Sequence, residues 1–143
     1  MDVDLERQRR PVPSTPPAVI LLDTHAAIWL ATGHRRADPL RRMPRLYLSP
    51  ATVLELQFLV EVGRIRLAAP LSVTSLSDDP RWLLDEPPSG KWFSAAAEVG
   101  WTRDPFDRLL VAHARVRGWR VATADAVLLD HLPPSESIRL QTR

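Results

Sequence analysis

Four acidic residues occupy places in the sequence where an ionised side chain needs a partner or a ligand. Asp23 and Asp125 each follow a short apolar run, where a buried strand would end and a helix would begin. Ligands of parallel α/β sheets bind in the crevice at the carboxyl ends of the strands, so both aspartates should face that crevice. Together with Glu55 and Asp107, which lie on predicted helices, they would form one acidic site.

Glu55 stands on the apolar face of its helix. That helix begins at Ser49 and Pro50, which are a favourable N-cap and first helical residue, and it ends near Gly63. A carboxylate on a core-facing stripe loses hydration, so it needs either a metal ion or a buried arginine as a partner. The apolar neighbours on its face, three and four positions away, are Ala51, Thr52, Phe58 and Leu59.

Each aspartate alone also has a structural explanation. Asp23 and Asp125 would serve equally as turn residues or as N-caps of the helices that follow them. In the sequence DPFD at 104–107, Asp104 is the natural N-cap of the next helix. Asp107 then lies in the first turn, where the helix dipole favours a negative charge. Asp104 can point the same way within that turn, so it stays a candidate for an outer role at the site.

Four carboxylates in one crevice repel one another unless a cation lies between them. Each like-charged pair costs roughly 4 kcal/mol at ~4 Å and an effective dielectric of about 20. A divalent cation turns this repulsion into ligation, and carboxylate oxygens favour Mg²⁺, or alternatively Mn²⁺. Such a site suits phosphoryl chemistry, because the metal holds the phosphate and lowers the pKa of a bound water. The chain has no cysteine, no serine elbow and no glycine-rich phosphate loop for a competing chemistry.

The composition is that of an ordinary soluble globular protein, with 143 residues, 45% hydrophobic and 25% charged. No apolar run approaches the roughly 20 residues that cross a membrane, and the N-terminus lacks the apolar region of a secretory signal. The absence of cysteine makes the cytosol the default compartment. The net charge of +2 permits nucleic-acid binding without establishing it. Lys91 is the only lysine, and the arginine bias suits phosphate contacts or reflects genome composition.

Strands and helices alternate along the chain, which predicts an α/β domain with a mainly parallel sheet. Residues 1–17 are charged and proline-rich, and we interpret them as a disordered tail or the product of an upstream start codon, ahead of a single domain over 18–143. Prolines divide 64–100 into short helical pieces that resist assignment. The other segments predict strands at 18–22, 46–48, 119–123 and 137–140, helices at 26–30, 50–62, 105–117 and 126–131, and a loop with at most one helical turn at 34–45.

Four segments carry recognisable motifs in a fixed order: VILLDTH at 19–25 with WL at 29–30 behind it, SPATVLEL at 49–56 continuing to GRI at 63–65, DPFDRLLVAHA at 104–114 and GWRVATAD at 118–125. Each is moderately specific, and their order and spacing together are highly specific. They resemble the PIN domain, and within that family the VapC-type toxins of toxin–antitoxin pairs. The resemblance covers roughly residues 18–131 and is poor between 66 and 100.

The resemblance implies a three-layer α/β/α fold and a magnesium- or manganese-dependent endoribonuclease that acts as a toxin in the cytoplasm. It also implies an RNA substrate and a homodimer whose groove takes the C-terminal segment of a cognate antitoxin. We hypothesise that an arginine of that segment, where it reaches the acidic site, displaces the metal by charge compensation. The acidic site falls on Asp23, Glu55, Asp107 and Asp125, which would hold the metal and the attacking water. Thr123 matches a polar position beside the metal in this family, although threonine is also a common residue of plain strands.

The chain departs from its relatives at one place, because Thr102 stands where related toxins often carry a histidine two residues before the Asp-Pro pair. This substitution would alter substrate handling without removing a carboxylate. His25 would either line the site or serve in capping or packing, and we favour capping or packing. His113, inside a helix, is expected to be structural.

Other functions fit the sequence less well. A haloacid-dehalogenase-like phosphatase needs a second aspartate where His25 stands, and a receiver domain needs a lysine late in the sheet. The main alternative is a catalytically silent PIN-like module that binds RNA or protein, which would normally have lost a carboxylate. Aromatic residues in and beside the irregular segment suggest a partner surface, with core packing expected for at least two of them: Trp82, Trp92, Phe93 and Trp101.

Overall fold

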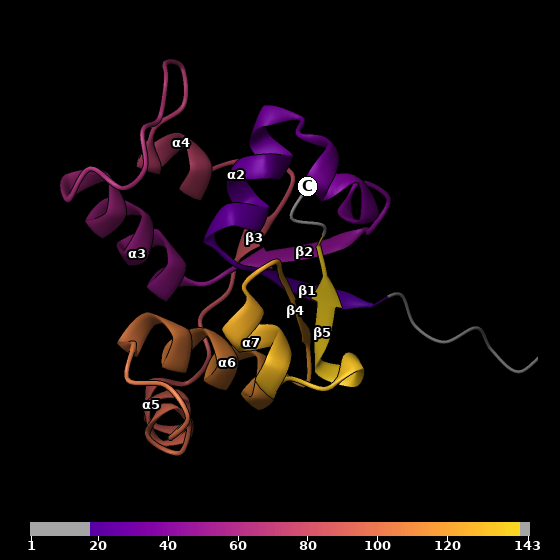
Figure 1. The fold of residues 1–143 in the computed structure, drawn as a ribbon, viewed down its shortest axis with the longest axis vertical. Helices are drawn as coiled ribbons and strands as arrows, with labels where there is room; N and C mark the ends of the chain where they lie inside the picture. The colour runs from indigo at the N-terminus through magenta and orange to yellow at the C-terminus, as the bar shows by residue number, and fades with distance from the viewer. Residues whose placement is uncertain (1–17, 141–143) are drawn as a thin grey trace, which may run out of the picture.

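Five short strands form one fully parallel sheet at the centre of the molecule, in the order β3-β2-β1-β4-β5 (Figure 1). The computed structural model describes residues 18–140, so the tail predicted at 1–17 lies outside the described residues. The strands are β1 (Val19–Leu22), β2 (Arg45–Leu48), β3 (Leu83–Leu84), β4 (Arg120–Thr123) and β5 (Ser137–Arg139).

Helices connect the strands and cover both faces of the sheet, which confirms the predicted three-layer α/β/α fold (Figure 1). The α-helices are α2 (Thr24–Thr32), α3 (Pro50–Glu61), α4 (Val73–Ser77), α5 (Ser89–Ala97), α6 (Pro105–Arg117) and α7 (Ala126–His131), and the 3₁₀ helices are η1 (Arg35–Leu40) and η2 (Pro134–Glu136).

Strand β1 explains the layering, because its side chains alternate between the two faces. Ile20 and Leu22 pack with α2, η1 and α4, whereas Leu21 packs with α6 and α7. All three side chains are fully buried, as a central strand covered on both faces requires. The continuous apolar run in the sequence is therefore the centre of two cores that share one sheet.

Side-chain caps fix where the helices begin. Ser49 caps α3 and Pro50 is its first residue, as the sequence predicts. Asp23, Asp104 and Asp125 cap α2, α6 and α7, each accepting a backbone N–H through its Oδ1 oxygen. The cap thus sets each aspartate at the start of a helix and at the end of the segment before it.

The segment 64–100, which the sequence left unassigned, contains α4, the edge strand β3 and α5. Strand β3 has only two residues, and α5 has Pro88 at its N-cap position and therefore no side-chain cap, so neither has the pattern by which strands and helices are predicted. The region 34–45, expected to be a loop with at most one helical turn, contains the six-residue 3₁₀ helix η1. The other predicted boundaries agree within two residues.

The expectation that at least two of the aromatic residues pack in the core is confirmed. Trp82 and Trp92 are buried, and their indole N–H groups donate to the carbonyls of Leu76 and Leu109. Phe93 is exposed on α5, and Trp101 stacks on the ring of His131. Within residues 18–140 none of the helices is long and apolar enough to cross a membrane.

Candidate metal centre

Asp23 and Asp125 lie side by side because the strands that precede them are neighbours. Strands β1 and β4 pair in parallel, so both carboxyl ends meet at one edge of the sheet. Asp23 is 7% exposed and its Oδ1 accepts the backbone N–H of Ala26 at 2.8 Å. Asp125 is exposed, and its Oδ1 accepts two N–H groups of α7 at 2.8 and 3.1 Å. The capping and metal-binding interpretations therefore do not exclude each other, since a cap uses one oxygen of two.

Glu55 reaches the same place from α3 and has no arginine partner among residues 18–140. Its Oε1 accepts the hydroxyl of Thr24 at 2.6 Å. The expectation that Phe58 and Leu59 place this face of the helix against the core is wrong. Phe58 is 45% exposed, and both residues line an open cleft. Of the four neighbours of Glu55 on this face, only Ala51 and Thr52, in the first turn, are buried, so beyond that turn the face lines the cleft.

Asp104 and Asp107 come from the first turn of α6 and meet Glu55. One carboxylate oxygen from each of Glu55, Asp104 and Asp107 lies within 4.8 Å of the others. Asp104 caps the helix, accepting the N–H groups of Phe106 and Asp107 at 2.8 and 3.2 Å. The sequence assigned Asp104 chiefly to capping, whereas the structure also brings it into the acidic cluster.

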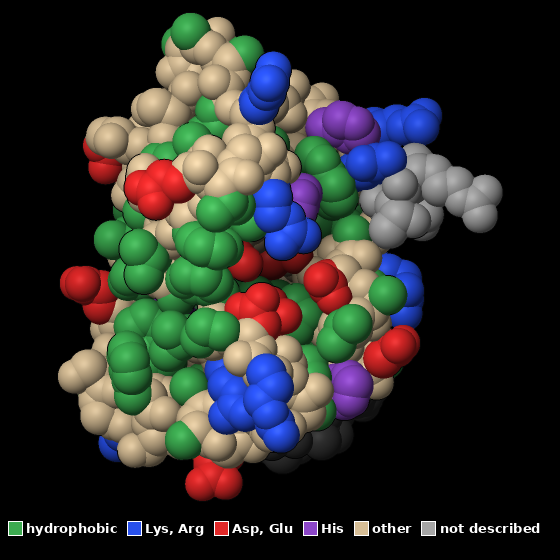
Figure 2. Space-filling view, turned by 60° about the vertical axis from the view of Figure 1, so that its left-hand side comes forward, with side chains coloured by type: hydrophobic (Ala, Val, Ile, Leu, Met, Phe, Trp, Pro, Cys, Tyr) green, Lys and Arg blue, Asp and Glu red, His purple; other side chains and the backbone are tan. Residues whose placement is uncertain are grey.

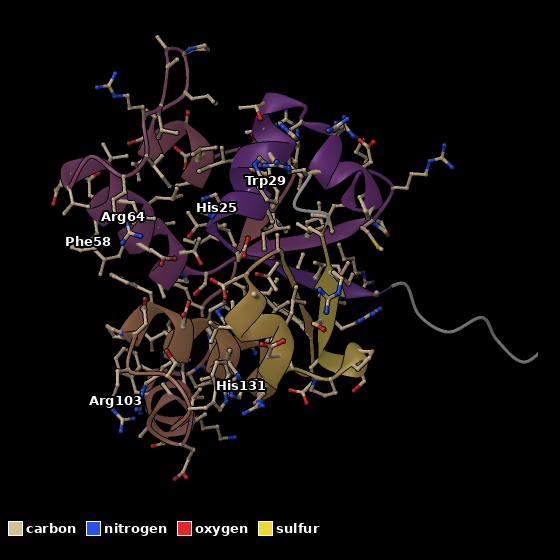
Figure 3. The ribbon with its side chains drawn as sticks, in the orientation of Figure 1. His25, Trp29, Phe58, Arg64, Arg103 and His131 are labelled. Atoms are coloured by element: carbon tan, nitrogen blue, oxygen red, sulfur yellow. The ribbon has the colours of Figure 1, made fainter. Side chains whose placement is uncertain are left out.

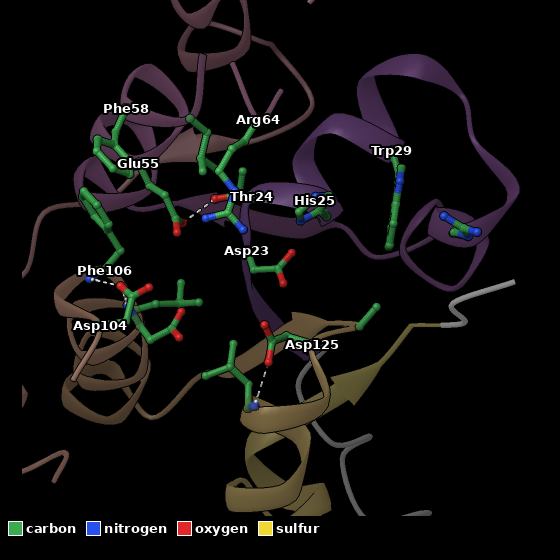
Figure 4. Close-up of a pocket in the computed structure, with 16 residues that line it drawn as sticks. Asp23, Thr24, His25, Trp29, Glu55, Phe58, Arg64, Asp104, Phe106 and Asp125 are labelled. Atoms are coloured by element: carbon green, nitrogen blue, oxygen red, sulfur yellow. Dashed lines mark hydrogen bonds between the residues drawn. The ribbon is translucent and has the colours of Figure 1, made fainter. Parts of the chain in front are cut away.

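All five carboxylates line one cleft with a volume of about 440 Å³. Figure 4 shows Asp23, Glu55, Asp104 and Asp125 approaching the same space from different elements. On the surface, acidic side chains gather in a hollow with cationic side chains around it (Figure 2). We call the set of Asp23, Glu55, Asp104, Asp107 and Asp125 the acidic cluster.

Crowding in the acidic cluster changes the proton affinity of its members. Burial, followed by the charges of Asp104, Glu55, Asp125 and Asp23, raises the pKa of Asp107 to about 7. Burial also raises the pKa of Asp23 and of Glu55 above their usual values, against hydrogen bonds that lower them. A cluster of this kind holds a proton near neutral pH or takes up a cation in its place.

The donor set fits a hard divalent cation. The acidic cluster offers only carboxylate oxygens, and the residues around it include no cysteine. Oxygen ligands of this type suit Mg²⁺ and Mn²⁺. Glu55, Asp104 and Asp107 are close enough to share one ion, and Asp23 and Asp125 lie across the same cleft.

Two threonines support the carboxylates. Thr123 is fully buried, its hydroxyl accepts the N–H of Asp125 at 2.9 Å, and its hydrogen bond to Asp23 opposes the rise in the pKa of that group. Thr24, which the sequence analysis did not single out, holds Glu55. The only signal for it was a hydroxyl directly after Asp23, which is too common to be informative. Thr102 accepts the backbone N–H of Asp104 at 3.2 Å, so it contacts the capping residue.

The two histidines differ in position. His113 is fully buried, bonds Asp85 through Nε2 at 2.8 Å and packs on Trp92 and Trp119, so its structural role is confirmed. His25 is exposed and lines the cleft, and its ring packs against Trp29. It caps no helix, because Asp23 caps α2.

Comparison with known proteins gives a consistent result. The sequence profile of the PIN domain matches residues 20–132. Ribonuclease VapC22 of Mycobacterium tuberculosis is 30% identical over 122 residues, which are 80% of this chain and 93% of that protein.

Solved structures share the fold at low sequence identity. A toxin–antitoxin complex from Klebsiella pneumoniae matches with a TM-score of 0.61 and 14% identity, over 83% of this chain and 95% of that one. PAE2754 of Pyrobaculum aerophilum matches with a TM-score of 0.59 and 22% identity, over 86% and 90% of the two chains.

Proposed function

The chain belongs to the PIN domain family, and from this we propose that it is a magnesium-dependent endoribonuclease, the toxin of a toxin–antitoxin pair. Manganese would serve as an alternative metal. In this proposal Asp23, Glu55, Asp107 and Asp125 are the catalytic metal ligands, and Asp104 adds a carboxylate at the same cleft. Its site of action would be the cytoplasm, where a toxin of this kind meets cellular RNA.

One observation carries the proposal, namely that the members of the acidic cluster meet in one open cleft. Their separation in the sequence, from residue 23 to residue 125, means that the whole fold is needed to bring them together. Among residues 18–140 none of the five forms an ion pair with an arginine or lysine. A purely structural cluster would gain from such partners, because uncompensated like charges cost stability.

The chemistry divides between the metal and the chain. A bound Mg²⁺ would supply Lewis acidity toward the phosphodiester and a lowered pKa for a water. The chain's own contribution is to fix the ligands: the caps orient Asp23 and Asp125, and the hydroxyl of Thr24 orients Glu55. Asp107, whose pKa is raised to about 7, would have to give up its proton to bind the ion. The cleft is open, so an RNA strand can reach it.

An antitoxin partner is supported by an exposed apolar stripe on α3. Leu54, Phe58 and Val62 recur at every fourth position and are 61%, 45% and 50% exposed. Such a stripe suits an amphipathic partner segment. Phe58 also lines the cleft, so a segment docked on α3 would continue toward the acidic cluster. An arginine at its end would compete with the metal for the carboxylates. We include a homodimer in the proposal, to be checked by light scattering of the purified protein.

RNA cleavage tests the proposal. Purified protein, freed of any antitoxin, is incubated with total RNA and Mg²⁺, with and without EDTA, beside the variant Asp107→Asn. The matched control is Asp130→Asn, an exposed aspartate on α7 that does not line the cleft. We expect cleavage by the wild type and by Asp130→Asn, none with EDTA, and a loss of at least about 100-fold in Asp107→Asn.

A folded wild type that binds Mg²⁺ yet cuts no RNA would favour the catalytically silent binding module. Cleavage that persists in EDTA, or in Asp107→Asn, would contradict the assignment of the acidic cluster.

A further inference from the structure

One wall of the cleft is a row of aromatic and cationic side chains that the metal chemistry does not use. His25 and Trp29 lie four residues apart on α2, with ring centroids 5.7 Å apart and ring planes at 47°. The guanidinium carbon of Arg36 lies 5.2 Å from the centre of a Trp29 ring. All three residues line the same cleft as the acidic cluster. Figure 3 shows His25 and Trp29 following one another along this side of the molecule.

The polar groups of this row have no partner among residues 18–140. The ring of His25 is exposed and accepts or donates no hydrogen bond there. The guanidinium of Arg36 forms no ion pair, and its Nε is buried without a hydrogen-bond partner. Buried polar groups are nearly always satisfied, so the Nε of Arg36 needs a partner that the described residues do not supply.

Arg64 faces the row from the segment after α3. It is exposed, lines the cleft, and in Figure 4 its guanidinium lies near Thr24, on the side of the cleft opposite Asp125. Despite the acidic surroundings it forms no ion pair with a carboxylate within the described part of the chain. A cation that lines the same cleft as five carboxylates without pairing with them keeps its donors free for an anion such as a phosphate.

We propose that His25, Trp29, Arg36 and Arg64 form a subsite for one unpaired nucleotide of the RNA, next to the phosphodiester at the acidic cluster. The proposal rests on the ribonuclease function argued above and specifies which RNA that site accepts. The nucleobase stacks on the exposed face of His25, because a separation of 5.7 Å leaves no room for a base between the two rings. Trp29 packs against the His25 ring and holds it in place, Arg36 lies over Trp29 and supplies positive charge, and Arg64 binds the adjoining phosphate.

The subsite selects single-stranded RNA. A base stacked on His25 has left its own helical stack, which is easy in loops and single strands and costly in a duplex. Proteins that bind single strands combine aromatic side chains, which stack on the bases, with cationic side chains, which bind the phosphates. Both kinds of side chain line this cleft. Stacking carries little sequence information, so the subsite favours unpaired RNA without selecting a base.

Binding of a fluorescent RNA tests this subsite. A single-stranded RNA of random sequence and about 12 nucleotides is titrated with protein in Mg²⁺, and affinity is measured by fluorescence anisotropy. All proteins carry Asp107→Asn so that the RNA is not consumed. A duplex of the same length is the second ligand. Cleavage of total RNA by the chain without Asp107→Asn is measured in parallel, so that failure of the ribonuclease function is seen separately.

The substitutions separate stacking from charge. We expect His25→Ala to weaken binding by about 5- to 100-fold and His25→Phe to keep it within about threefold, because phenylalanine retains the stacking face. Arg36→Ala and Arg64→Ala should each weaken binding at low salt, and each should lower the slope of log Kd against log salt by about 0.7. Arg45→Ala is the matched control, since Arg45 is exposed at the amino end of β2, away from the cleft. Melting temperatures check that the variants fold.

Wild-type cleavage together with unchanged RNA affinity in His25→Ala and both arginine variants would overturn the subsite and leave the ribonuclease proposal standing. Equal affinity for duplex and single strand would also overturn it. Loss of binding in these variants beside a wild type that cuts nothing would support the subsite and contradict the ribonuclease function. A chain that neither binds nor cuts RNA would contradict both.

Discussion

At the scale of residues, Asp107 shows how far a carboxylate can be displaced from its ordinary behaviour by its neighbours. Burial and four nearby carboxylates raise its pKa to about 7, so ionising it in the folded chain costs more than in the unfolded chain. Its contribution to stability is therefore complete below its unfolded pKa near 3.8 and is lost as the pH rises through about 7. The same crowding that weakens the empty site favours a cation in it.

We predict that Asp107→Asn stabilises the metal-free protein, and increasingly so as the pH rises. Full conversion of the pKa difference would give about 4 kcal/mol, but the open cleft screens these charges, so we expect about 1–2 kcal/mol near pH 8 and little near pH 5. Urea denaturation in EDTA at both pH values measures the difference. In saturating Mg²⁺ the wild type should regain the free energy of unfolding that it lacks relative to Asp107→Asn. A wild type as stable as Asp107→Asn at pH 8 in EDTA would contradict the crowding.

Single residues were predicted well where their position in the sequence determined their surroundings. Asp23 and Asp125 follow buried runs, and parallel pairing of the two strands was enough to bring them together. Asp104 was underrated because one role, capping, already explained it, and nothing local shows that Glu55 lies beside it. Arg64 stands in the second motif of the family resemblance, but its place in the cleft was not predicted, since that depends on how the segment after α3 folds back.

At the scale of elements, the aspartates at the helix N-termini have two roles, because they cap the helices and also supply the carboxylates of the acidic cluster. The Oδ1 atoms of Asp23, Asp104 and Asp125 cap α2, α6 and α7, which fixes each carboxylate at the rim of the sheet. A capping aspartate has few accessible rotamers, so its second oxygen is held in place before any ligand arrives. The three helices therefore orient the acidic cluster while they satisfy their own first turns.

Substitutions at Asp125 separate helix capping from metal binding. Asn is as good an N-cap as Asp, whereas Ala removes the cap at a cost of about 1 kcal/mol. We expect Asp125→Asn to keep the stability of the metal-free protein within about 0.5 kcal/mol and to weaken Mg²⁺ binding at least tenfold, and Asp125→Ala to lose both. Denaturation in EDTA and calorimetric titration with Mg²⁺ provide the two readouts. If Asp125→Asn bound Mg²⁺ like the wild type, Asp125 would be a cap and nothing more.

Elements were predictable from the sequence where their length and caps were ordinary, and were missed where tertiary contacts define them. Strand β3 has two residues, both exposed, and pairs only with β2 at the edge of the sheet. The chain after it is held by Asp85, which bonds His113 and Arg117 on α6. Asp85 is separated from His113 by 28 residues and from Arg117 by 32 residues. Contacts at such separations leave no periodic pattern in the sequence, so the sequence did not allow the segment 64–100 to be assigned.

At the scale of the whole molecule, the acidic hollow and the apolar stripe of α3 lie on adjoining surfaces. Phe58 belongs to both, because it lines the cleft and continues the stripe of Leu54 and Val62. Its ring also packs beside Phe106, with centroids 5.9 Å apart. One partner segment could thus cover the stripe and close the cleft, which would link antitoxin binding to loss of activity.

We predict that charge on the stripe prevents formation of the antitoxin complex. The double variant Leu54→Asp, Val62→Asp should weaken the complex at least about 100-fold, because both residues are exposed in the free chain and would be buried by the partner. Affinity is measured by calorimetry with the purified antitoxin. The matched control, Leu83→Asp, changes an exposed leucine on the edge strand β3. Unaltered affinity in the double variant would place the antitoxin on another surface.

Five carboxylates positioned by α2, α3, α6 and α7 form one metal centre in this proposal, and the position of the metal tests it most directly. Crystals grown with Mn²⁺, measured with X-rays near the manganese absorption edge, reveal the ion by its anomalous scattering. We predict a peak in the cleft, bound by Glu55 and Asp107 together with Asp23, Asp104 or Asp125, and absent from crystals of Asp107→Asn. A cleft without a peak at saturating Mn²⁺, or a peak held by other residues, would contradict the account.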